Sequence, residues 1–333
     1  MSANERATEA ADFVLIGAGF FGYAREIIAK LRLRGREVLW FEDRPSTDTF
    51  TKATLRLAPA LLAGRSEGYF KQIADGLRGR RIRDVLVIKG EAMSPAAIRY
   101  LRAALPDATF TLYFWDGYRN MPADSRDKVT LFDRAFTFDS ADARADTRLT
   151  YRPLFFLDEY AHLPPVSQDI DLLFFGTAHS DRYSVLKRLA RAVPPRLRFE
   201  KLLYFPSRSV YRFRRVFDPR LRGARRDEFI FQPLGKSAIL QLVARSRAVV
   251  DIERTIQTGL TMRTVETLGA GRKLITTNPT VSEADFYHPD NIAIIDRDRP
   301  SVPDTFFERP YVAPAAELLQ RYSLSGWIDE VIP

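Results

Sequence analysis

The sequence predicts an α/β protein of two doubly wound halves, each with a parallel sheet and helices that cover it. The length of 333 residues is enough for two domains of ordinary size. Short apolar segments alternate with helical segments along both halves, as they do when crossover helices join parallel strands. The stretch over 152–168 contains three prolines and is the expected joint. We therefore expect one domain over 1–153, a second over 154–312 and a closing helical segment over 313–333.

The first half opens as a strand, a turn and a helix. The apolar strand Phe13–Ile16 is followed by Gly17-Ala18-Gly19-Phe20-Phe21-Gly22, a G-x-G-x-x-G turn, and then by a helix over 21–34. Gly35 is the expected stop of that helix, and a second strand over 37–41 follows it. Further strands are expected at 84–88, 109–114 and 135–138, with helices at 69–77 and 95–104.

The second half repeats this order. A strand over 171–175 ends in Gly176 and Thr177, and the helix over 182–192 stops at two prolines. Two such domains would leave a cleft between the carboxyl ends of their sheets, where open α/β sheets bind ligands. Other strands are expected at 198–205, 229–232, 248–252, 273–277 and 291–295, with helices at 237–245 and 313–330.

The composition excludes several kinds of protein. The chain has no cysteine, which excludes disulfides, thiolate zinc sites and cysteine nucleophiles. Its three histidines are far apart without metal-ligand spacing, and no aspartate pair suited to a catalytic metal stands at a strand end. No apolar run approaches the roughly 18 residues of a membrane span, and the acidic, alanine-rich N-terminus lacks the features of a signal peptide. We expect a cytoplasmic protein without a metal site.

The net charge of +9 is unevenly distributed along the chain. The segment 196–226 holds eleven Lys or Arg residues and two acidic ones, with aromatic residues between them. Such a segment can bind an anionic membrane surface, a phosphate-rich substrate or nucleic acid. Because no recognition motif accompanies the charge, we do not expect nucleic acid. Peripheral binding to an anionic inner membrane remains open beside a plainer alternative, a solvated basic helix face whose aromatic residues pack on the core.

The segment 257–277 is the most informative part of the chain. It predicts a loop, a helix and a buried strand, and it brings Thr258 and Gly259 to the start of the helix. Free N–H groups and the positive end of the helix dipole make an anion site there. Arg263 and Glu266 are three residues apart and share one helix face, where an Arg suits a diphosphate and a Glu suits sugar or ribose hydroxyls. The alternative is an ordinary amphipathic helix on which the two residues form a surface pair.

Several segments resemble the bacterial CgeB-like glycosyltransferases. The resemblance is carried by 175–177 with 180–183, by 248–253 and by 257–277, and it extends to 87–91, 113–116 and 152–156. It implies a GT-B fold, two Rossmann-like domains with a cleft between them, and a part in lipopolysaccharide, capsule or exopolysaccharide synthesis. A nucleotide-sugar would be the donor substrate, the acceptor a glycan or lipid-linked glycan, and no cofactor is implied. The last helix crosses back to the first domain in this fold, so Tyr322 and Trp327 are expected at the domain junction.

The resemblance also implies where the donor binds. The residues near the diphosphate, ribose or base would be Gly176, Thr177, His179, Arg182, Thr258, Gly259, Arg263 and Glu266. Many retaining GT-B enzymes carry two glutamates eight positions apart at this helix start, and here Thr258 occupies the first position. The retaining pattern is therefore incomplete, and inversion is favoured. For His179, a capping or packing role is an equally good explanation.

An inverting transferase needs a general base to take the proton of the attacking acceptor hydroxyl. Glu91 follows the strand over 85–88 and Asp116 the strand over 112–114, so each stands at the carboxyl end of a first-domain strand. We place Glu91 ahead, because Asp116 precedes Gly117 and a turn explains it equally well. Either carboxylate could instead cap a helix. Without a metal, arginine side chains and helix dipoles would stabilise the negative charge of the diphosphate.

The glycine-rich turn supports a competing hypothesis, an NAD-dependent oxidoreductase. The dinucleotide fingerprint would consist of Gly17, Gly19, Gly22 and Glu42. Phe20 and Phe21 are bulky where a pyrophosphate would approach, and in a GT-B protein the loop of Gly17, Gly19, Phe20 and Gly22 would line the acceptor side instead. A third alternative is a non-catalytic relative that binds a nucleotide-sugar. Elsewhere, Asp251 and Glu253 end a strand, and an ion pair with the adjacent Arg254 is their expected role.

Overall fold

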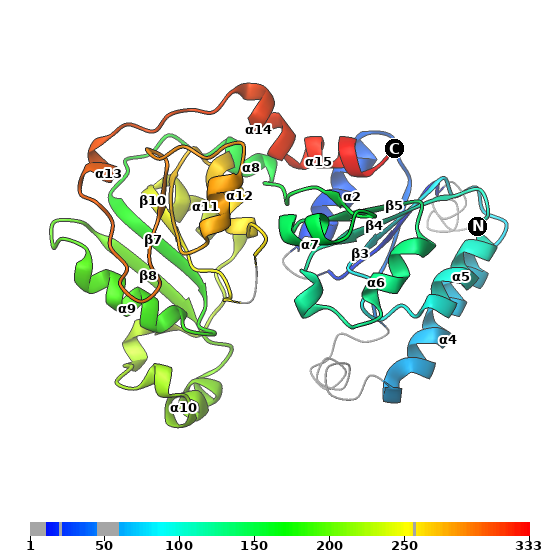
Figure 1. Cartoon of the computed structure of the whole chain (residues 1–333), viewed down its shortest axis with the longest axis horizontal. Helices are drawn as coiled ribbons and strands as arrows, with labels where there is room; N and C mark the ends of the chain where they lie inside the picture. The colour runs from blue at the N-terminus through cyan, green and yellow to red at the C-terminus, as the bar shows by residue number, and fades with distance from the viewer. Residues whose placement is uncertain (1–10, 20–21, 45–59, 256–257) are drawn as a thin grey trace. The chain divides into compact units, whose positions relative to one another are not determined.

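The chain forms two α/β units (Figure 1). The computed structural model describes residues 11–19, 22–44, 60–255 and 258–333. The first unit extends to Leu154 and includes Leu324–Pro333, and the second unit is Phe155–Ser323. Each unit has its own six-stranded sheet, and every strand pair in both sheets is parallel. In the described part of the chain, no helix has the length and apolar character needed to cross a membrane.

The sheet of the first unit has the order β2-β1-β3-β4-β5-β6. Its strands are β1 Phe13–Ile16, β2 Val38–Phe41, β3 Asp84–Ile88, β4 Thr109–Phe114, β5 Arg134–Thr137 and β6 Thr150–Tyr151. All residues of β1 and β3 are buried, as expected for central parallel strands that are covered on both faces. The chain leaves β1 toward β2 on one side and continues from β3 on the other, so the topological switch point lies between β1 and β3.

The described residues of the first unit form six α-helices. They are α2 Tyr23–Leu33, α4 Ala60–Leu77, α5 Pro95–Ala104, α6 Ser125–Lys128, α7 Ser140–Ala145 and α15 Leu324–Val331. Two of these helices begin with a side-chain cap: Ser94 accepts a hydrogen bond from Ala97 N–H at α5, where Pro95 takes the first helical position, and Asp139 accepts from Ala141 N–H at α7. The C-terminal α15 is anchored by Trp327, which is fully buried with its ring centroid 4.8 Å from that of Tyr113.

The sheet of the second unit has the order β12-β11-β10-β7-β8-β9. Its strands are β7 Ile170–Thr177, β8 Phe199–Tyr204, β9 Phe229–Ile230, β10 Ser246–Asp251, β11 Lys273–Thr276 and β12 Ile292–Ile294. Counted from β7, this is the strand order 3-2-1-4-5-6 of dinucleotide-binding folds, with the switch point between β7 and β10. The predicted fold class, α/β with two doubly wound halves, is confirmed.

The helices of the second unit cover both faces of this sheet (Figure 1). They are α8 Asp158–Ala161, α9 Arg182–Ala192, α10 Arg208–Phe217, α11 Lys236–Ala244, α12 Met262–Gly269, α13 Thr305–Glu308 and α14 Ala316–Tyr322. The last turn of α12 leads to Gly271, whose φ of 58° lies in the left-handed region, so glycine suits the end of this helix.

The prediction of one closing helix over 313–330 is wrong. The segment forms two helices, α14 and α15, with Ser323 between them in an extended conformation. Ser323 makes an isolated parallel bridge to Phe156, and Phe156 N–H donates to the Tyr322 carbonyl. These backbone contacts replace the intrahelical bonds that a continuous helix would need at this point. Tyr322 ends in the second unit, against Phe286 with ring centroids 5.0 Å apart, whereas Trp327 belongs to the core of the first.

Candidate functional site

The second unit places its functional candidates at the switch point of its sheet. β7 ends in Gly176 and Thr177, and the neighbouring β10 ends in Asp251. The chain leaves these two strands in opposite directions along the sheet, so their carboxyl ends are open to a ligand. The helices α9 and α12 begin shortly after β7 and β10 and bring Arg182 and Arg263 to the same place.

Gly176 has no side chain where two guanidinium groups converge. A Cβ on Gly176 would lie 3.3 Å from Nη2 of Arg263 and 3.5 Å from Nη1 of Arg182. Its φ of 151° is also a conformation that residues with a side chain rarely adopt. Glycine therefore lets both arginines approach the backbone at the end of β7.

Arg263 lies against two aromatic rings. Its guanidinium lies 4.4 Å from the ring centroid of Phe175 and 5.5 Å from that of Phe174, distances typical of cation–π contacts. Nη1 lies 3.5 Å from an Asp251 oxygen, a long ion pair, and the buried Nε makes no hydrogen bond to any described residue. The guanidinium thus keeps unused donor capacity, which suits a ligand that carries acceptor oxygens.

Arg182 is positioned by backbone carbonyls. Its Nε donates to the Ile252 carbonyl at 2.6 Å and Nη1 to the Thr177 carbonyl at 3.3 Å. Burial and then the charge of Arg263 lower the pKa of Arg182 to about 10, and the nearby Asp251 only partly opposes this. Because the charge of Arg263 lowers the pKa of Arg182, a bound anion would relieve repulsion at this site.

The pKa of His179 is also affected by the excess of positive charge at this site. Burial lowers its pKa to about 3, helped by the charges of Arg182, Arg254, Arg214 and Arg263. The ring is therefore neutral near pH 7, and its Nδ1 lies 3.0 Å from the hydroxyl of Ser180. A neutral imidazole can hydrogen-bond to a ligand without adding to the charge.

The start of α12 is fixed by the buried Asp251. Thr261 is the N-cap of the helix, and its hydroxyl accepts from Thr264 N–H at 3.2 Å and donates to Asp251 at 2.5 Å. The hydroxyl of Thr264 donates to the same carboxyl at 3.1 Å. Asp251 is fully buried, so it ties the end of β10 to the first turn of α12.

The loop before α12 is anchored by its backbone. The Asn278 side chain donates to the carbonyls of Thr258 and Gly259 at 3.4 and 3.3 Å, and the Thr280 hydroxyl donates to Thr258 at 2.7 Å. These bonds fix the loop through its carbonyl groups. Gln257, where the predicted anion-binding segment begins, lies outside the described residues.

Glu266 shares the Arg263 face of α12 as the spacing predicted, but it is buried. Its partner is Tyr160 of α8: burial raises the pKa of the Tyr160 phenol, and the charge of Glu266 and a hydrogen bond to it add to the effect. The phenol donates to the carboxylate. Arg263 and Glu266 are thus not a surface pair, because each has partners of its own.

The expected ion pair of Asp251 and Glu253 with Arg254 is wrong. Asp251 lies beside Arg263, and Glu253 is bound by Arg297, which also holds Asp181 at 2.8 Å. The Glu253 carboxyl accepts a further bond from the Thr277 hydroxyl at 2.6 Å. Arg254 is exposed, and both acids turn inward to residues that are distant in sequence, which adjacency alone does not reveal.

In the first unit, the two base candidates meet at one lysine. Lys89 follows β3 with a φ of 70°, and its Nζ lies 2.5 Å from Asp116 and 3.3 Å from Glu91. Burial alone would lower the pKa of Lys89, but the charges of Asp116 and Glu91 outweigh it and raise the pKa. Arg44 lies 3.5 Å from the other oxygen of Glu91 and makes two 2.8 Å bonds to the buried Asp43. Sequence reasoning assigned no role to Lys89 or Arg44.

The glycine-rich turn is filled by its own neighbours. A Cβ on Gly19 would lie 2.9 Å from Trp40 and from a Glu42 oxygen, and Gly19 N–H donates to Glu42 at 3.3 Å. Gly17 accepts from the Trp40 indole at 2.9 Å, and Gly22 has a φ of 77° as the N-cap of α2. The Glu42 carboxylate already accepts the hydrogen bond of the Gly19 N–H, which a pyrophosphate would need. This argues against a dinucleotide at this turn. Phe20 and Phe21 lie outside the described residues.

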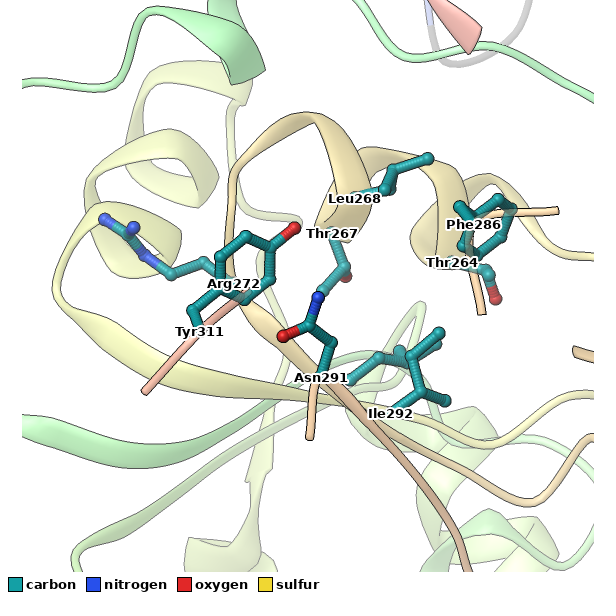
Figure 2. A pocket seen from close by; sticks show the side chains of 9 residues that line it. Thr264, Thr267, Leu268, Arg272, Phe286, Asn291, Ile292 and Tyr311 are labelled. Atoms are coloured by element: carbon teal, nitrogen blue, oxygen red, sulfur yellow. The ribbon is translucent and has the colours of Figure 1, made fainter. Parts of the chain in front are cut away.

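A small pocket lies on another face of α12 (Figure 2). Two of its polar side chains already donate hydrogen bonds to backbone carbonyls. The Asn291 amide donates to the Val312 carbonyl at 2.6 Å, and Arg272 donates to the Ala244 carbonyl at 2.9 Å. Burial raises the pKa of Tyr311 to about 12. The lining residues are Thr264, Thr267, Leu268, Arg272, Leu274, Phe286, Asn291, Ile292 and Tyr311. We assign this pocket a structural role. Across the described ranges, no three His, Asp or Glu side chains gather where they could hold a metal ion.

Protein-family models and curated protein sequences gave no match to this chain. Solved structures did. The α,α-trehalose-phosphate synthase (UDP-forming) from Burkholderia xenovorans, in complex with glucose-6-phosphate, is similar with a TM-score of 0.62 and 14% identity, over 96% of this chain and 98% of that one.

Two further structures show the same similarity. A glycosyltransferase from Rickettsia africae ESF-5 gives a TM-score of 0.60 at 12% identity, over 96% of each chain. Anabaena Alr3699/HepE in complex with UDP and glucose gives 0.57 at 13% identity, over 96% of this chain and 98% of that one. At these identities the similarity establishes the fold, and the chain has the GT-B fold of glycosyltransferases.

Proposed function

We propose that the protein is a glycosyltransferase of the CgeB-like kind that uses a nucleotide-sugar donor. The observation that carries the proposal is the pair Arg182 and Arg263 at the side-chain-free Gly176, on the switch point of the second sheet. This cluster has more positive charge than its acids offset, as the lowered pKa values of Arg182 and His179 indicate. A diphosphate supplies the missing negative charge and the acceptor oxygens.

The donor would lie along the carboxyl ends of β7 and β10. The diphosphate would bind Arg182 and Arg263 with N–H groups of Gly176 and Thr177, and His179 would add a neutral hydrogen bond. Thr258, Gly259 and Glu266 would contact the ribose or sugar. The Anabaena relative in fold was solved with UDP and glucose, which supports a nucleoside diphosphate sugar as the donor class.

The proposed reaction is a single inverting displacement. The acceptor hydroxyl oxygen forms a bond to the anomeric carbon, the bond from that carbon to the diphosphate breaks, and the nucleoside diphosphate leaves with the electron pair. Glu91 takes the proton of the hydroxyl, with Asp116 as the alternative base. Arg182 and Arg263 stabilise the negative charge that develops on the leaving group, so the mechanism is metal-independent.

The acceptor class in this proposal is a polysaccharide, lipopolysaccharide or lipid-linked glycan. We place the protein in the cytoplasm, where it would act on acceptors at the inner membrane. Nucleic acid is not a partner in this proposal. The reaction needs no cofactor beyond the nucleotide-sugar itself.

Thermal unfolding of the full chain with UDP, GDP, CMP, dTDP, ADP and NAD⁺ tests the donor site. A ligand that binds the native state raises Tm, and a hundredfold excess over Kd adds about 2.7 kcal/mol. We expect one nucleotide of the transferase class to stabilise the chain. Stabilisation by NAD⁺ alone would support the oxidoreductase instead, and no stabilisation by any of them would favour a relative that has lost donor binding.

Two variants locate the binding. Arg263→Ala should raise the Kd of that nucleotide roughly tenfold to a hundredfold, the loss expected for hydrogen bonds to a charged group. Gly176→Ala should act similarly, because its methyl group meets both guanidinium groups. The matched controls are the exposed Arg299→Ala and Gly223→Ala, a glycine with a φ of 75° where an added Cβ would lie 3.8 Å from Nζ of Lys187, an ordinary contact. Equal affinity loss in variant and control would contradict the assignment.

A further inference from the structure

Helix α10 carries an apolar face that points to solvent. Large hydrophobic side chains are rarely exposed in the described part of this chain, and half of the eight most exposed lie on this one helix. Their exposed fractions are 39% for Val210, 65% for Phe213, 76% for Val216 and 68% for Phe217. Figure 1 shows α10 at the lower margin of its unit, beyond the sheet.

The four side chains form one stripe. At 100° per residue they fall within an arc of roughly 120°. The rings of Phe213 and Phe217 lie with their centroids 4.7 Å apart, so they make one continuous patch. The opposite side of the helix faces the protein, where Tyr211 is buried and donates to the Ala224 carbonyl at 3.0 Å.

Three arginines lie along one side of this stripe, within an arc of roughly 60° between it and the buried Tyr211. Arg208, Arg212 and Arg215 are exposed, and no carboxylate of the described residues lies within ion-pair distance of them. Arg214 differs, because it donates to the Ala178 carbonyl at 2.7 Å and to Asp218 at 2.6 Å, and so fastens α10 to the loop after β7. After the helix come the exposed Arg222 and Arg226.

We propose that α10 docks the protein on an anionic lipid bilayer, with Phe213 and Phe217 at the level of the acyl boundary and the adjacent arginines on lipid phosphates. An apolar stripe with basic residues beside it is the pattern of helices that lie in a membrane interface. Charge complementarity selects an anionic surface. Nucleic acid fits less well, because valine side chains and two rings packed on each other offer no separate stacking surfaces for bases.

Within the basic segment 196–226, this inference assigns membrane binding to one face of α10. Of the aromatic residues in that segment, Phe205 and Tyr211 belong to the core, as the plainer alternative expected, and Phe213 and Phe217 do not. The proposed docking does not depend on the proposed transferase activity. Each can therefore fail without the other.

Sedimentation of the full chain with vesicles tests the proposal. Vesicles of phosphatidylcholine alone are compared with vesicles that also contain phosphatidylglycerol, at low and high salt. We expect binding to the anionic vesicles only, weakened by salt. Phe213→Ser with Phe217→Ser should lower the partition coefficient at least tenfold, because two exposed rings no longer enter the interface. Replacing Arg208, Arg212 and Arg215 by Gln should lower it roughly a hundredfold, at about fivefold per charge.

Matched controls exclude general effects of charge and hydrophobicity. Leu33→Ser removes an 84%-exposed apolar side chain from the first unit, and replacing the exposed Arg81, Arg83 and Arg99 by Gln removes the same charge there. Both controls should bind vesicles like the wild type. The proposal is overturned if the α10 variants bind anionic vesicles unchanged, or if the wild type binds neither vesicle. It is also overturned if the two Phe substitutions only abolish a dimer seen by light scattering, or if an RNA oligonucleotide binds in place of vesicles.

Discussion

The two units place charged side chains at the same point of their sheets, but with opposite balance. At the switch point of the second sheet, Arg182 and Arg263 share the buried carboxylate of Asp251. At that of the first sheet, one lysine, Lys89, is held by two carboxylates, Glu91 and Asp116. One site lacks negative charge, and the other has more of it than its lysine can neutralise.

The difference fits the division of chemistry in the proposed reaction. A diphosphate needs cations and donors that no protein group has already taken, and the second unit provides them. A proton acceptor needs a carboxylate held in place by hydrogen bonds, and the first unit provides two. In the proposed reaction, the second unit would therefore bind the leaving group and the first unit would accept the proton.

The largest expected effect concerns the carboxylates of the first unit. Glu91→Gln should lower kcat by roughly a hundredfold to ten-thousandfold, the usual contribution of a general base. Asp116→Asn should lower it less, if Glu91 is the base and Asp116 only holds Lys89. The measurement is turnover with the nucleotide-sugar identified by the binding experiment.

Donor binding separates the two units in this test. Because neither carboxylate belongs to the second unit, both variants should keep the nucleotide Kd of the wild type. Equal turnover in Glu91→Gln and the wild type would remove Glu91 from the base role, and a larger loss in Asp116→Asn would transfer that role to Asp116.

The second effect concerns the buried carboxylate of the second unit. Asp251→Ala should lower the free energy of unfolding by about 3 kcal/mol, because Arg263 and two threonine hydroxyls lose a buried partner. Asp116→Ala should cost less than about 1 kcal/mol, since Asp116 is 31% exposed and Lys89 keeps Glu91. Urea unfolding of both variants measures the contrast.

A conservative variant separates packing from charge. Asp251→Asn keeps an acceptor for Thr261 and Thr264 but not the negative charge near Arg263. It should recover part of the lost stability and bind the nucleotide more tightly than the wild type, because the negative charge beside Arg182 and Arg263 is reduced. Equal stability of Asp251→Ala and Asp116→Ala would refute the proposed difference between the two sites.

Much of the fold follows from local pattern. Apolar strands alternate with helices over the whole chain, and the predicted strands at 13–16, 84–88, 171–175 and 273–277 lie within a residue or two of β1, β3, β7 and β11. These are central or near-central strands, where burial on both faces requires continuous apolar runs. The closing helix was wrong because the bridge of Ser323 to Phe156 joins residues far apart in sequence.

The candidate site was predictable only in part. Gly176 and Arg263 stand out in the sequence because a strand-end glycine and a helix-start arginine have local signatures. The roles of Asp251, Tyr160 and Phe175 depend on contacts that adjacency does not indicate: the sequence favoured Arg254 as the partner of Asp251, and α12 supplied Arg263 instead. The exposure of single side chains was not predictable either. The sequence did not indicate that Phe213 is exposed while Tyr211, two residues before it, is buried.

The smallest expected effect is a pH dependence in the second unit. The pKa of His179 is about 3 in the folded protein, and an unfolded histidine titrates near 6.5. Between these values the unfolded state binds a proton that the folded state excludes, so stability falls as the pH drops below about 6.5. The loss from this group should be about 1 kcal/mol per pH unit or less, and it should be absent in His179→Asn. Above pH 7 the two proteins should have the same pH dependence. Thermal unfolding from pH 7 to pH 5 measures the difference, and a bound nucleotide should reduce it, because its diphosphate offsets the arginine charges that lower the pKa of His179. A wild type and variant with parallel profiles over this range would show that His179 does not sense the cluster.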